Sequence, residues 1–387
     1  MKKISVFATT ALLGTVLLAV PVFANDHTVP GGPSTNGEMS MESIVTYSDM
    51  IKILGDIART SKGKVEVFKL DDYGKSEQGR SFYVAKVGNG PKKIWIQARI
   101  HGNERLTTEA ALQLVKTMGT GKADKEVQKI LDELTLYVIP IYNPDGSEMN
   151  TRTTQLIDDK TNEPILDGND KPREIDLNRD WNLLDKNEDG EIDGFVADES
   201  KAFYKYWADL DPDFMIDLHH QGLKTVPGTN ESTSMSLGVS LAPNGPTLPD
   251  TPYNDITRQA QGYVFDALSK YGYTHIDRYT VGDGQYEIDI RGGVTSGMML
   301  ALDYEGLNAE GHSNPAIFFE TKGMTREGSL GQKSNGYLTK QNYLGLKALL
   351  FGLASGEVED ADPEHWEDIP HREIAGYSTD YAGTILK

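Results

Sequence analysis

Four side chains able to bind a metal ion or transfer a proton each follow a predicted apolar strand. They are His101, Glu104, His219 and Glu320, which come after the segments KIWIQARI, DFMIDL and AIFF. An isolated ionisable group at the end of a buried strand costs free energy unless a partner compensates it. A divalent cation is such a partner. Two histidines with one glutamate, leaving one position open to water, are a composition used by catalytic zinc sites.

The spacing of His101 and Glu104 carries little information by itself. With 8 His and 58 acidic residues among 387, about one His-x-x-acid pair is expected by chance. The pair at 101 is informative through its position, because it ends a buried strand and a third candidate ligand follows another such strand. His220 is an alternative to His219, since neighbouring residues of a strand point to opposite faces.

Apolar strands alternate with segments of helical periodicity along most of the chain. The predicted strands are Lys64–Leu70, Ser81–Val87, Lys93–Ile100, Leu134–Ile141, Phe214–Leu218 and Ala316–Glu320. A predicted helix begins at Tyr47, with apolar residues at 50, 51, 53, 54 and 57. The other predicted helices are Thr107–Met118, Lys125–Glu133, Ser200–Leu210, Thr257–Tyr271 and Asn335–Leu353, whereas 150–200 and 221–254 read as loops. This alternation predicts a single-domain α/β fold, with a mixed, mostly parallel twisted sheet and helices on both faces. Reactive groups in such folds lie beyond the carboxyl ends of the strands.

The first 24 residues differ from the rest and predict a secretory signal peptide. Two lysines precede an apolar run from Ala11 to Val20, and a small-residue cleavage site ends at Ala24. The run is short for a membrane span, so an N-terminal membrane anchor is the less favoured alternative. We therefore expect a secreted, extracellular protein. Its parts are a signal peptide (1–24), a flexible leader (25–44), one folded domain (45–355) and an acidic tail without an assigned place (356–387).

The chain is acidic and contains no cysteine. Its formal net charge is -20, and loss of the two lysines of the signal segment brings it to -22. Such a charge disfavours nucleic acid and anionic membranes as partners. Without cysteine there are no disulfides, so added rigidity has to come from packing or bound ions.

Several short motifs surround the candidate ligands in a fixed order. They are the Gly74-Lys-Ser-x-x-Gly-Arg80 turn, His101-x-x-Glu104, Asn143-Pro-Asp-Gly146, Asp176-x-Asn178-Arg179, Asp217-Leu-His219 and a late strand-borne Glu320. In this order they resemble the zinc carboxypeptidase family, the carboxypeptidase A-like metallopeptidases. The resemblance runs from about Thr46 to Leu353 and implies that 45–355 is a catalytic domain of this type.

The resemblance implies a role for each of these residues. His101, Glu104 and His219 would hold one zinc ion, with Glu320 as general base and then general acid. Zinc lowers the pKa of a bound water toward neutrality, and a nearby carboxylate can then move the proton. Asp176 would accept a hydrogen bond from the first histidine, as carboxylates beside metal-bound imidazoles usually do.

Three further residues are implied to contact the substrate. Asn178 and Arg179 would grip the C-terminal carboxylate of a peptide, a task suited to the two parallel hydrogen bonds of a guanidinium. Arg152 would polarise the scissile carbonyl. Its alignment is looser because the intervening loop differs in length, and Arg173 is the fallback. Tyr304 is the nearest candidate for the tyrosine that closes over the substrate in this family.

Each assignment has a structural alternative. Glu320 could be a core residue in an ion pair with Lys322, and both Arg152 and Arg179 could be ordinary surface cations. Asp217 is interpreted as a structural hydrogen-bonding group rather than a catalyst.

A second ion is indicated by an acidic loop after Arg179. The pattern D-x-N-x-D-G-x-I-D places oxygen ligands at alternate positions, namely Asp185, Asn187, Asp189, Glu191 and Asp193. This spacing is typical of a calcium-binding loop, in which glycine allows a sharp bend. The twelfth position is Val196 instead of Glu, so the alternative is a solvated acidic turn.

These features predict a zinc-dependent metallocarboxypeptidase that removes C-terminal residues from peptides or proteins. One alternative is a cell-wall peptidase with the same zinc chemistry and a different pocket. Another is a zinc deacylase of N-acyl amino acids, and a third is a binding module that has lost catalysis. The Asn178-Arg179 pair favours a substrate with a free chain end.

Overall fold

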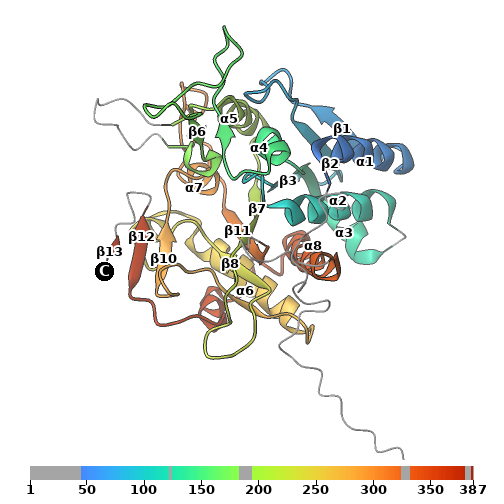
Figure 1. Cartoon of the computed structure of the whole chain (residues 1–387). Coiled ribbons are helices and arrows are strands. Elements are labelled where there is room, and N and C mark those ends of the chain that lie inside the picture. Colours follow the sequence, from blue (N-terminus) through green and yellow to red (C-terminus); the bar gives the residue numbers. More distant parts are fainter. Residues whose placement is uncertain (1–44, 122–123, 183–193, 324–331, 380–384, 387) are drawn as a thin grey trace, which may run out of the picture.

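The computed structural model describes residues 45–121, 124–182, 194–323, 332–379 and 385–386 (Figure 1). Its centre is an eight-stranded mixed sheet. In spatial order the strands are β1 (Val65–Lys69), β2 (Tyr83–Val87), β4 (Leu134–Ile139), β3 (Lys92–Ala98), β7 (Phe214–Gln221), β11 (Ala316–Lys322), β8 (Met235–Gly238) and β9 (Ile276–Arg278). The pairs β4–β3, β3–β7, β7–β11 and β8–β9 are parallel, and the other neighbours are antiparallel. The predicted mixed, mostly parallel sheet of one α/β domain is confirmed.

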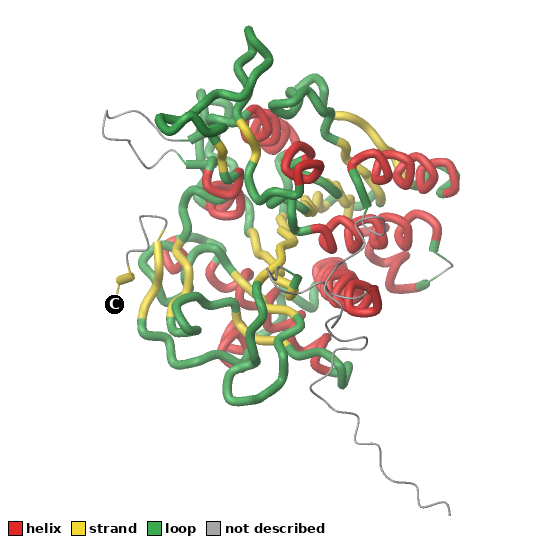
Figure 2. Tube along the Cα trace, viewed as in Figure 1, coloured by secondary structure: helices red, strands yellow, loops and turns green. Residues whose placement is uncertain are grey.

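Helices cover both faces of this sheet (Figures 1 and 2). On one face lie α1 (Tyr47–Thr60), α2 (Arg105–Thr120), α3 (Lys125–Glu133), α6 (Asn254–Ser269) and α8 (Gln332–Ser355). On the other lie α5 (Asp198–Leu210) and α7 (Val294–Met299), and the short α4 (Pro144–Met149) follows β4. Local sequence explains their ends: Thr46 and Asp49 form a capping box that starts α1, and Asp124 caps α3.

Aromatic side chains fill the layer between α5 and the sheet. Phe203 of α5 stacks on Tyr142 with ring centroids 3.9 Å apart and meets Trp95 of β3 edge-on at 6.2 Å. Trp181 and Trp207, both fully buried, contact each other at 5.9 Å. Rings of this size contribute a large share of the apolar area that a core buries. They hold the strands that carry the site at a fixed distance from α5.

Two elements near the site, β8 and α4, escaped the sequence prediction. The segment 221–254, predicted as loop, contains the buried strand β8, and the predicted turn at 143–146 begins α4. The strand β8 reads Met-Ser-Leu-Gly, without the β-branched residues that mark a buried strand. Its conformation is therefore set by pairing with β11 and β9 rather than by local preference.

The C-terminal segment packs against the domain. After α8, the 3-10 helix η4 (Pro363–Asp368) buries Trp366 to 2% exposure, and Ile369 is fully buried. The Arg278 guanidinium of β9 lies 4.5 Å from the Trp366 ring centroid and donates to the Trp366 carbonyl at 2.6 Å. Beyond it, β12 (Gly376–Thr379) pairs in parallel with β10 (Tyr286–Asp289) and antiparallel with β13 (Ile385–Leu386). The segment predicted as a tail without an assigned place thus belongs, over 356–379, to the folded body.

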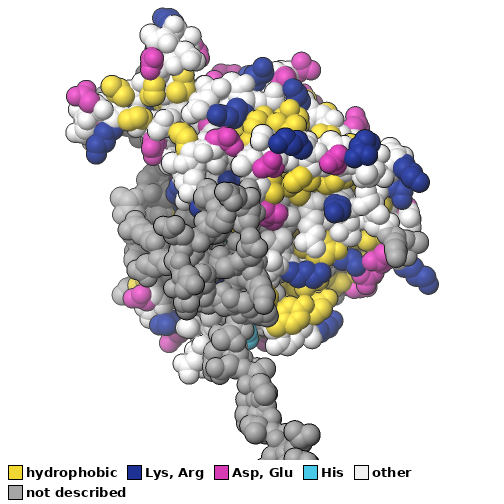
Figure 3. Space-filling view, turned by 45° about the vertical axis from the view of Figure 1, so that its right-hand side comes forward, with side chains coloured by type: hydrophobic (Ala, Val, Ile, Leu, Met, Phe, Trp, Pro, Cys, Tyr) yellow, Lys and Arg dark blue, Asp and Glu magenta, His cyan; other side chains and the backbone are white. Residues whose placement is uncertain are grey.

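An arm protrudes from the body between β5 (Thr154–Gln155) and β6 (Glu174–Ile175), at the top of Figure 1. Hydrophobic side chains lie on its surface in Figure 3, and Ile165 and Leu166 are 38% and 54% exposed. In the described part of the chain, no helix has the length and apolar character needed to cross a membrane. The predicted signal peptide and leader, residues 1–44, lie outside the described residues.

Candidate metal centre and its cavity

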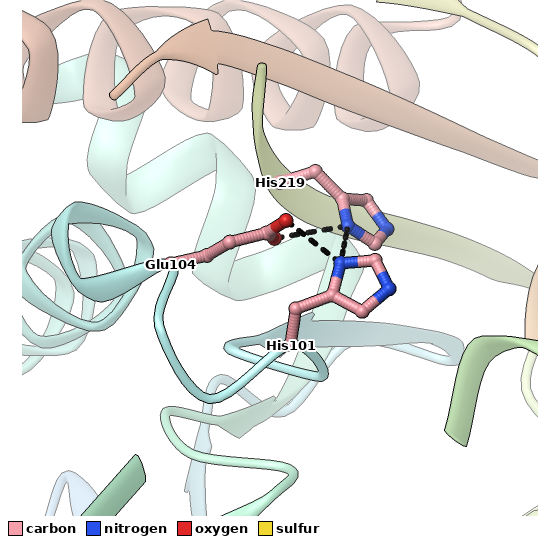
Figure 4. A group of neighbouring side chains, drawn as sticks. All are labelled: His101, Glu104 and His219. Atoms are coloured by element: carbon pink, nitrogen blue, oxygen red, sulfur yellow. Dashed lines mark hydrogen bonds and ion pairs between the residues drawn. The ribbon is translucent and has the colours of Figure 1, made fainter. Parts of the chain in front are cut away.

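Three strand- and loop-borne side chains converge at the carboxyl ends of β3 and β7 (Figure 4). His101 follows β3, Glu104 is the residue before α2, and His219 lies in β7. The His101 Nδ1 atom lies 2.7 Å from Glu104 Oε1, and His219 Nδ1 lies 3.1 Å from Glu104 Oε2. The two Nδ1 atoms are 3.3 Å apart. The structure thus brings together residues that are 118 positions apart in the chain.

The donor atoms of this cluster fit a zinc ion. Candidate ligand atoms of the three residues all lie within 4.8 Å of one another. The outer nitrogen of each imidazole faces a carboxylate: His101 Nε2 lies 3.3 Å from Asp176 Oδ1, and His219 Nε2 lies 2.9 Å from Asp217 Oδ2. A proton on each outer nitrogen leaves both inner lone pairs aimed at the Glu104 carboxylate, an arrangement that a cation stabilises. His101, Glu104 and His219 would therefore hold the ion.

Burial and mutual charge set the electrostatics of the cluster. The three side chains are only 4%, 1% and 4% exposed. Burial alone raises the pKa of Glu104, but the imidazoles of His101 and His219 outweigh it and hold that pKa well below its ordinary value. Burial lowers the pKa of His219, but the carboxylates of Asp217 and Glu104 raise it by more. The pKa of His219 is therefore raised well above its ordinary value. The neighbouring His220 has its pKa lowered to about 4, chiefly by burial.

Glu320 lies beside this cluster on β11. Its backbone position is paired with that of His219 on the parallel neighbour β7, and its side chain is 9% exposed. Burial raises the pKa of Glu320 to about 8, with Glu104 adding to the rise and His219 opposing it. The Lys322 ammonium donates to Ser232 Oγ at 2.8 Å, and among the described residues it makes no ion pair with Glu320. Glu320 thus lines one cavity with His101, Glu104 and His219 and is not used in a core ion pair with Lys322.

A cavity of about 110 Å³ adjoins the cluster. Besides the four residues above, its walls are Arg152, Asn178, Arg179, His220, Ser240, Tyr279, Ile288, Ile290, Gly293, Thr295 and Phe318. Arg152 Nε lies 2.9 Å from Asp176 Oδ2, so this one carboxylate contacts both an arginine and His101. Asn178 Oδ1 accepts a hydrogen bond from the Val294 backbone N–H at 3.2 Å. The structure thus brings the metal cluster and all three predicted arginine and asparagine positions to one cavity.

Two other predicted positions do not reach the cavity. Tyr304 stacks on Phe195 with ring centroids 4.3 Å apart, away from the cavity walls. Arg173, the fallback for Arg152, lies on the protruding arm. The predicted calcium ligands at 185–193 lie outside the described residues.

Tyr279 lines the cavity and was missed by the sequence analysis. It follows the three-residue strand β9, whose buried members Asp277 and Arg278 are charged. Charged residues interrupt the apolar pattern that marks a buried strand, so the carboxyl end of this strand could not be recognised. The useful signal would have been an aromatic residue directly after a short strand.

Comparison with known proteins identifies the family. Residues 53–296 match the family model described as zinc carboxypeptidase, which is more than half of the chain. The chain belongs to the zinc carboxypeptidase family. The match contains His101, Glu104, Asn178, Arg179 and His219 and ends before Glu320. The position of Glu320 beside the cluster therefore rests on the structure itself.

Individual family members share only parts of the sequence. A zinc carboxypeptidase of Saccharothrix mutabilis subsp. capreolus is 25% identical over 114 residues, 28% of this chain and 26% of that protein. Human carboxypeptidase A6 is 28% identical over 129 residues, 32% of this chain and 28% of that protein. The matched segment is thus well under a third of either relative's length. The fold is shared more widely: a structure of bovine thrombin-activatable fibrinolysis inhibitor with a tick carboxypeptidase inhibitor has a TM-score of 0.57 at 16% identity, covering 83% of this chain and 99% of that one.

Proposed function

We propose that this protein is a zinc-dependent metallocarboxypeptidase that hydrolyses the C-terminal peptide bond of peptides or proteins. The observation that carries the proposal is a single cavity lined by the His101–Glu104–His219 cluster, Glu320 and the Asn178–Arg179 pair. An ion site, a proton carrier and a carboxylate anchor are the three parts that such a reaction needs.

The Asn178–Arg179 pair would bind the chain end. Both residues belong to the 3-10 helix η2 (Leu177–Arg179), whose start is capped by the Asp176 carboxylate through the Asn178 N–H at 3.0 Å. A planar guanidinium and an amide can together donate several hydrogen bonds to one carboxylate. Since the same Asp176 faces His101, the anchor and the metal cluster are joined by one side chain.

Glu320 would move the proton during hydrolysis. When bound by His101, Glu104 and His219, zinc supplies a Lewis acid that makes water acidic and polarises a carbonyl. The Glu320 carboxylate, buried and beside the cluster, would accept a proton from the attacking water and return it to the leaving amine. Arg152 would stabilise negative charge on the scissile carbonyl oxygen, because it lines the same cavity.

Export is also part of the proposal. The two lysines, the apolar run and the small-residue site before Asn25 support cleavage by a signal peptidase and release outside the cell. N-terminal sequencing of protein from the culture medium tests this, and an intact N-terminus on membrane-bound protein would contradict it.

A panel of peptides with different C-terminal residues tests the activity. Each peptide is supplied as the free acid and as the C-terminal amide, with and without a zinc chelator followed by added zinc. We expect release of the last residue from the acids only, lost with chelator and restored by zinc. The variant Arg179→Ala should raise KM for the acids, with Arg173→Ala on the arm as matched control.

Three outcomes would replace the proposal. Chelator-insensitive cleavage would exclude zinc chemistry. Cleavage of cell-wall peptide fragments alone would favour a cell-wall peptidase, and hydrolysis of N-acyl amino acids alone would favour a deacylase.

A further inference from the structure

The face of the sheet on which α5 packs extends beyond that helix. Glu66 of β1 is paired with Lys86 of β2, and Lys86 is paired with Tyr137 of β4. Tyr137 is paired in turn with Trp95 of β3. Paired residues point to the same face, so these four side chains form one row across the sheet. Helix α5 packs on the row at Trp95, where the Tyr206 ring lies 5.4 Å away, whereas the other three members of the row are not buried.

A pocket of about 330 Å³ lies on this part of the face. Its walls are four aromatic rings, from Phe68, Tyr73, Tyr137 and Tyr206, together with charged side chains from β1, β2 and α5. Small-molecule sites of proteins are concave and largely apolar, with a few polar groups, and have volumes from about 300 Å³ upward. In the described part of the chain, no residue lines both this pocket and the metal cavity.

The rings of the pocket pack on one another around Tyr206. This ring is 5% exposed and meets Phe68 edge-on with centroids 6.4 Å apart and Tyr73 edge-on at 5.3 Å. Burial raises the pKa of Tyr206, and Tyr137 and Tyr73 raise it further, so the three phenols lie close together. The Tyr206 hydroxyl is buried and has no hydrogen-bond partner among the described residues. A buried phenol without a partner costs free energy, and the hydroxyl of a ligand can offset that cost.

The charged groups of the pocket are of both signs. The Lys86 ammonium lies 3.9 Å from the Glu66 carboxylate and 5.9 Å from the Tyr137 ring centroid. Burial raises the pKa of Tyr73, and a hydrogen bond to the Asp209 carboxylate raises it further. The walls therefore present carboxylates that accept, an ammonium that donates and phenols that do both. A neutral ligand with several hydroxyls matches this set, whereas a ligand with a net charge of either sign meets a like charge.

We propose that this pocket is a sugar-binding site that takes a neutral pyranose unit of a glycan. The C–H face of the pyranose packs on the partly exposed rings of Phe68 and Tyr73. Its hydroxyls donate to the Asp209 carboxylate and accept from the Lys86 ammonium. A cationic ligand is the less favoured occupant, because Lys86 already lies beside the Tyr137 ring where such a ligand would bind.

The pocket lies away from the catalytic edge of the sheet. Leu210, which lines the pocket at the end of α5, accepts a hydrogen bond through its carbonyl from Lys93 Nζ at 2.7 Å. Lys93 lies at the amino end of β3, whereas the metal cluster lies at the carboxyl end of that strand. A glycan held here leaves the metal cavity open. The site would tether the protein to glycan-bearing material and so raise the local concentration of peptides attached to it, a role beyond the proposed hydrolysis itself.

Calorimetry with soluble oligosaccharides tests the site without turnover. The full-length protein is titrated separately with N-acetylchitotetraose, cellotetraose and tetramethylammonium chloride, up to millimolar concentrations. We expect one of the two sugars to bind, and Tyr73→Ala to weaken its binding at least about 10-fold, the loss typical of an aromatic residue at the centre of a contact. Asp209→Asn should also weaken it, because a neutral amide accepts a weaker hydrogen bond than a carboxylate.

Two variants with matched chemistry serve as controls. Tyr271→Ala removes a 41% exposed ring and Asp132→Asn an exposed carboxylate of α3, and neither residue lines the pocket. Both should bind the sugar as the parent protein does. Peptide cleavage by Tyr73→Ala should equal that of the parent, so loss of the sugar site and failure of the proposed hydrolysis are separate observations.

Three results would overturn the sugar site. The first is that neither sugar binds the parent protein. The second is that a sugar binds equally well to the parent, to Tyr73→Ala and to Asp209→Asn, which would place its site elsewhere. The third is that tetramethylammonium binds, is lost in Tyr73→Ala and neither sugar competes with it, which would identify a cation site.

Discussion

Glu320 and His219 are paired residues on the neighbouring parallel strands β11 and β7. Parallel strands end at the same edge of a sheet, and adjacent strands lie about 4.8 Å apart. Glu320, the proposed proton carrier, is therefore placed beside the His101–Glu104–His219 cluster by the backbone hydrogen bonds of the sheet rather than by a loop. We expect the distance between the backbones of Glu320 and His219 to stay the same when ions or substrates bind.

Replacing Glu320 by Gln should remove catalysis and leave the ion site intact. General acid–base groups contribute about 10²- to 10⁴-fold to rates, so kcat should fall by at least about 100-fold. Rates with a cleaved peptide and zinc content by atomic absorption check this. Glu174→Gln, in β6 at the base of the protruding arm, is the control. A variant that keeps both zinc and full activity would remove the role assigned to Glu320.

Replacing His219 by Ala should weaken zinc binding more than replacing His220 by Ala. The Nδ1 atom of His219 faces Glu104, whereas His220 is absent from the cluster of ligand atoms. Loss of groups that merely support ligands costs about 10- to 100-fold in metal affinity, so His219→Ala should cost more. Zinc retained after dialysis measures the difference. Retention by His219→Ala together with loss by His220→Ala would reverse the assignment.

Trp366→Ala should destabilise the whole domain. The ring is 2% exposed and contacts Arg278, so its loss leaves a cavity beside a buried cation. Substitutions of this kind cost about 3–5 kcal/mol. Urea unfolding checks the value, with Leu223→Ala at a 57% exposed side chain as the control. An unfolding free energy like that of the control would show that the C-terminal segment does not stabilise the domain.

Glu199→Gln should stabilise the protein increasingly as pH rises. The carboxyl is fully buried and accepts one hydrogen bond from Thr154 at 2.9 Å. Burial, and then Asp145, raise the pKa of Glu199 well above its ordinary value, so its folded form is neutral.

The sign of this pH dependence follows from linkage. Below the pKa that Glu199 has in the unfolded chain, its carboxyl is protonated in both states and does not change the free energy of unfolding. As the pH rises from there toward the raised pKa of the folded state, only the unfolded chain ionises, so the free energy of unfolding falls. Glutamine avoids this loss. The melting temperatures of variant and parent should agree near pH 4 and separate by pH 8, by about 2–4 °C for each kcal/mol. A gap that narrows with rising pH would contradict the raised pKa.

Calcium should raise the melting temperature if the 185–193 loop binds it. A ligand at 100 times its dissociation constant stabilises a native state by about 2.7 kcal/mol. Thermal unfolding with calcium and with EGTA measures the shift, and Asp185→Ala with Asp189→Ala should abolish it. Identical curves for the parent protein would identify the loop as an acidic turn.

The apolar runs and the residues beside them determined much of the fold and of the metal site. The helix Lys125–Glu133 was predicted with the bounds that the structure has, because its periodicity and its Asp124 cap are local properties. His101, Glu104 and His219 could be recognised as candidate metal ligands because each interrupts or follows an apolar segment. An ionisable side chain at such a place is costly to bury unless a partner such as a cation compensates it. Such signals depend only on residues a few positions apart.

Tertiary structure decided the rest. The strands β8 and β9 have weak local patterns and form through pairing with distant segments. The sequence therefore could not predict that Tyr279 lines the cavity and that Tyr304 does not. In the sequence, Trp366 is one residue of an acidic segment without clear periodicity. Only the structure shows that its ring contacts Arg278. Pairing and packing between remote segments are cooperative. No single segment of the chain therefore determines which other segment it will pair with.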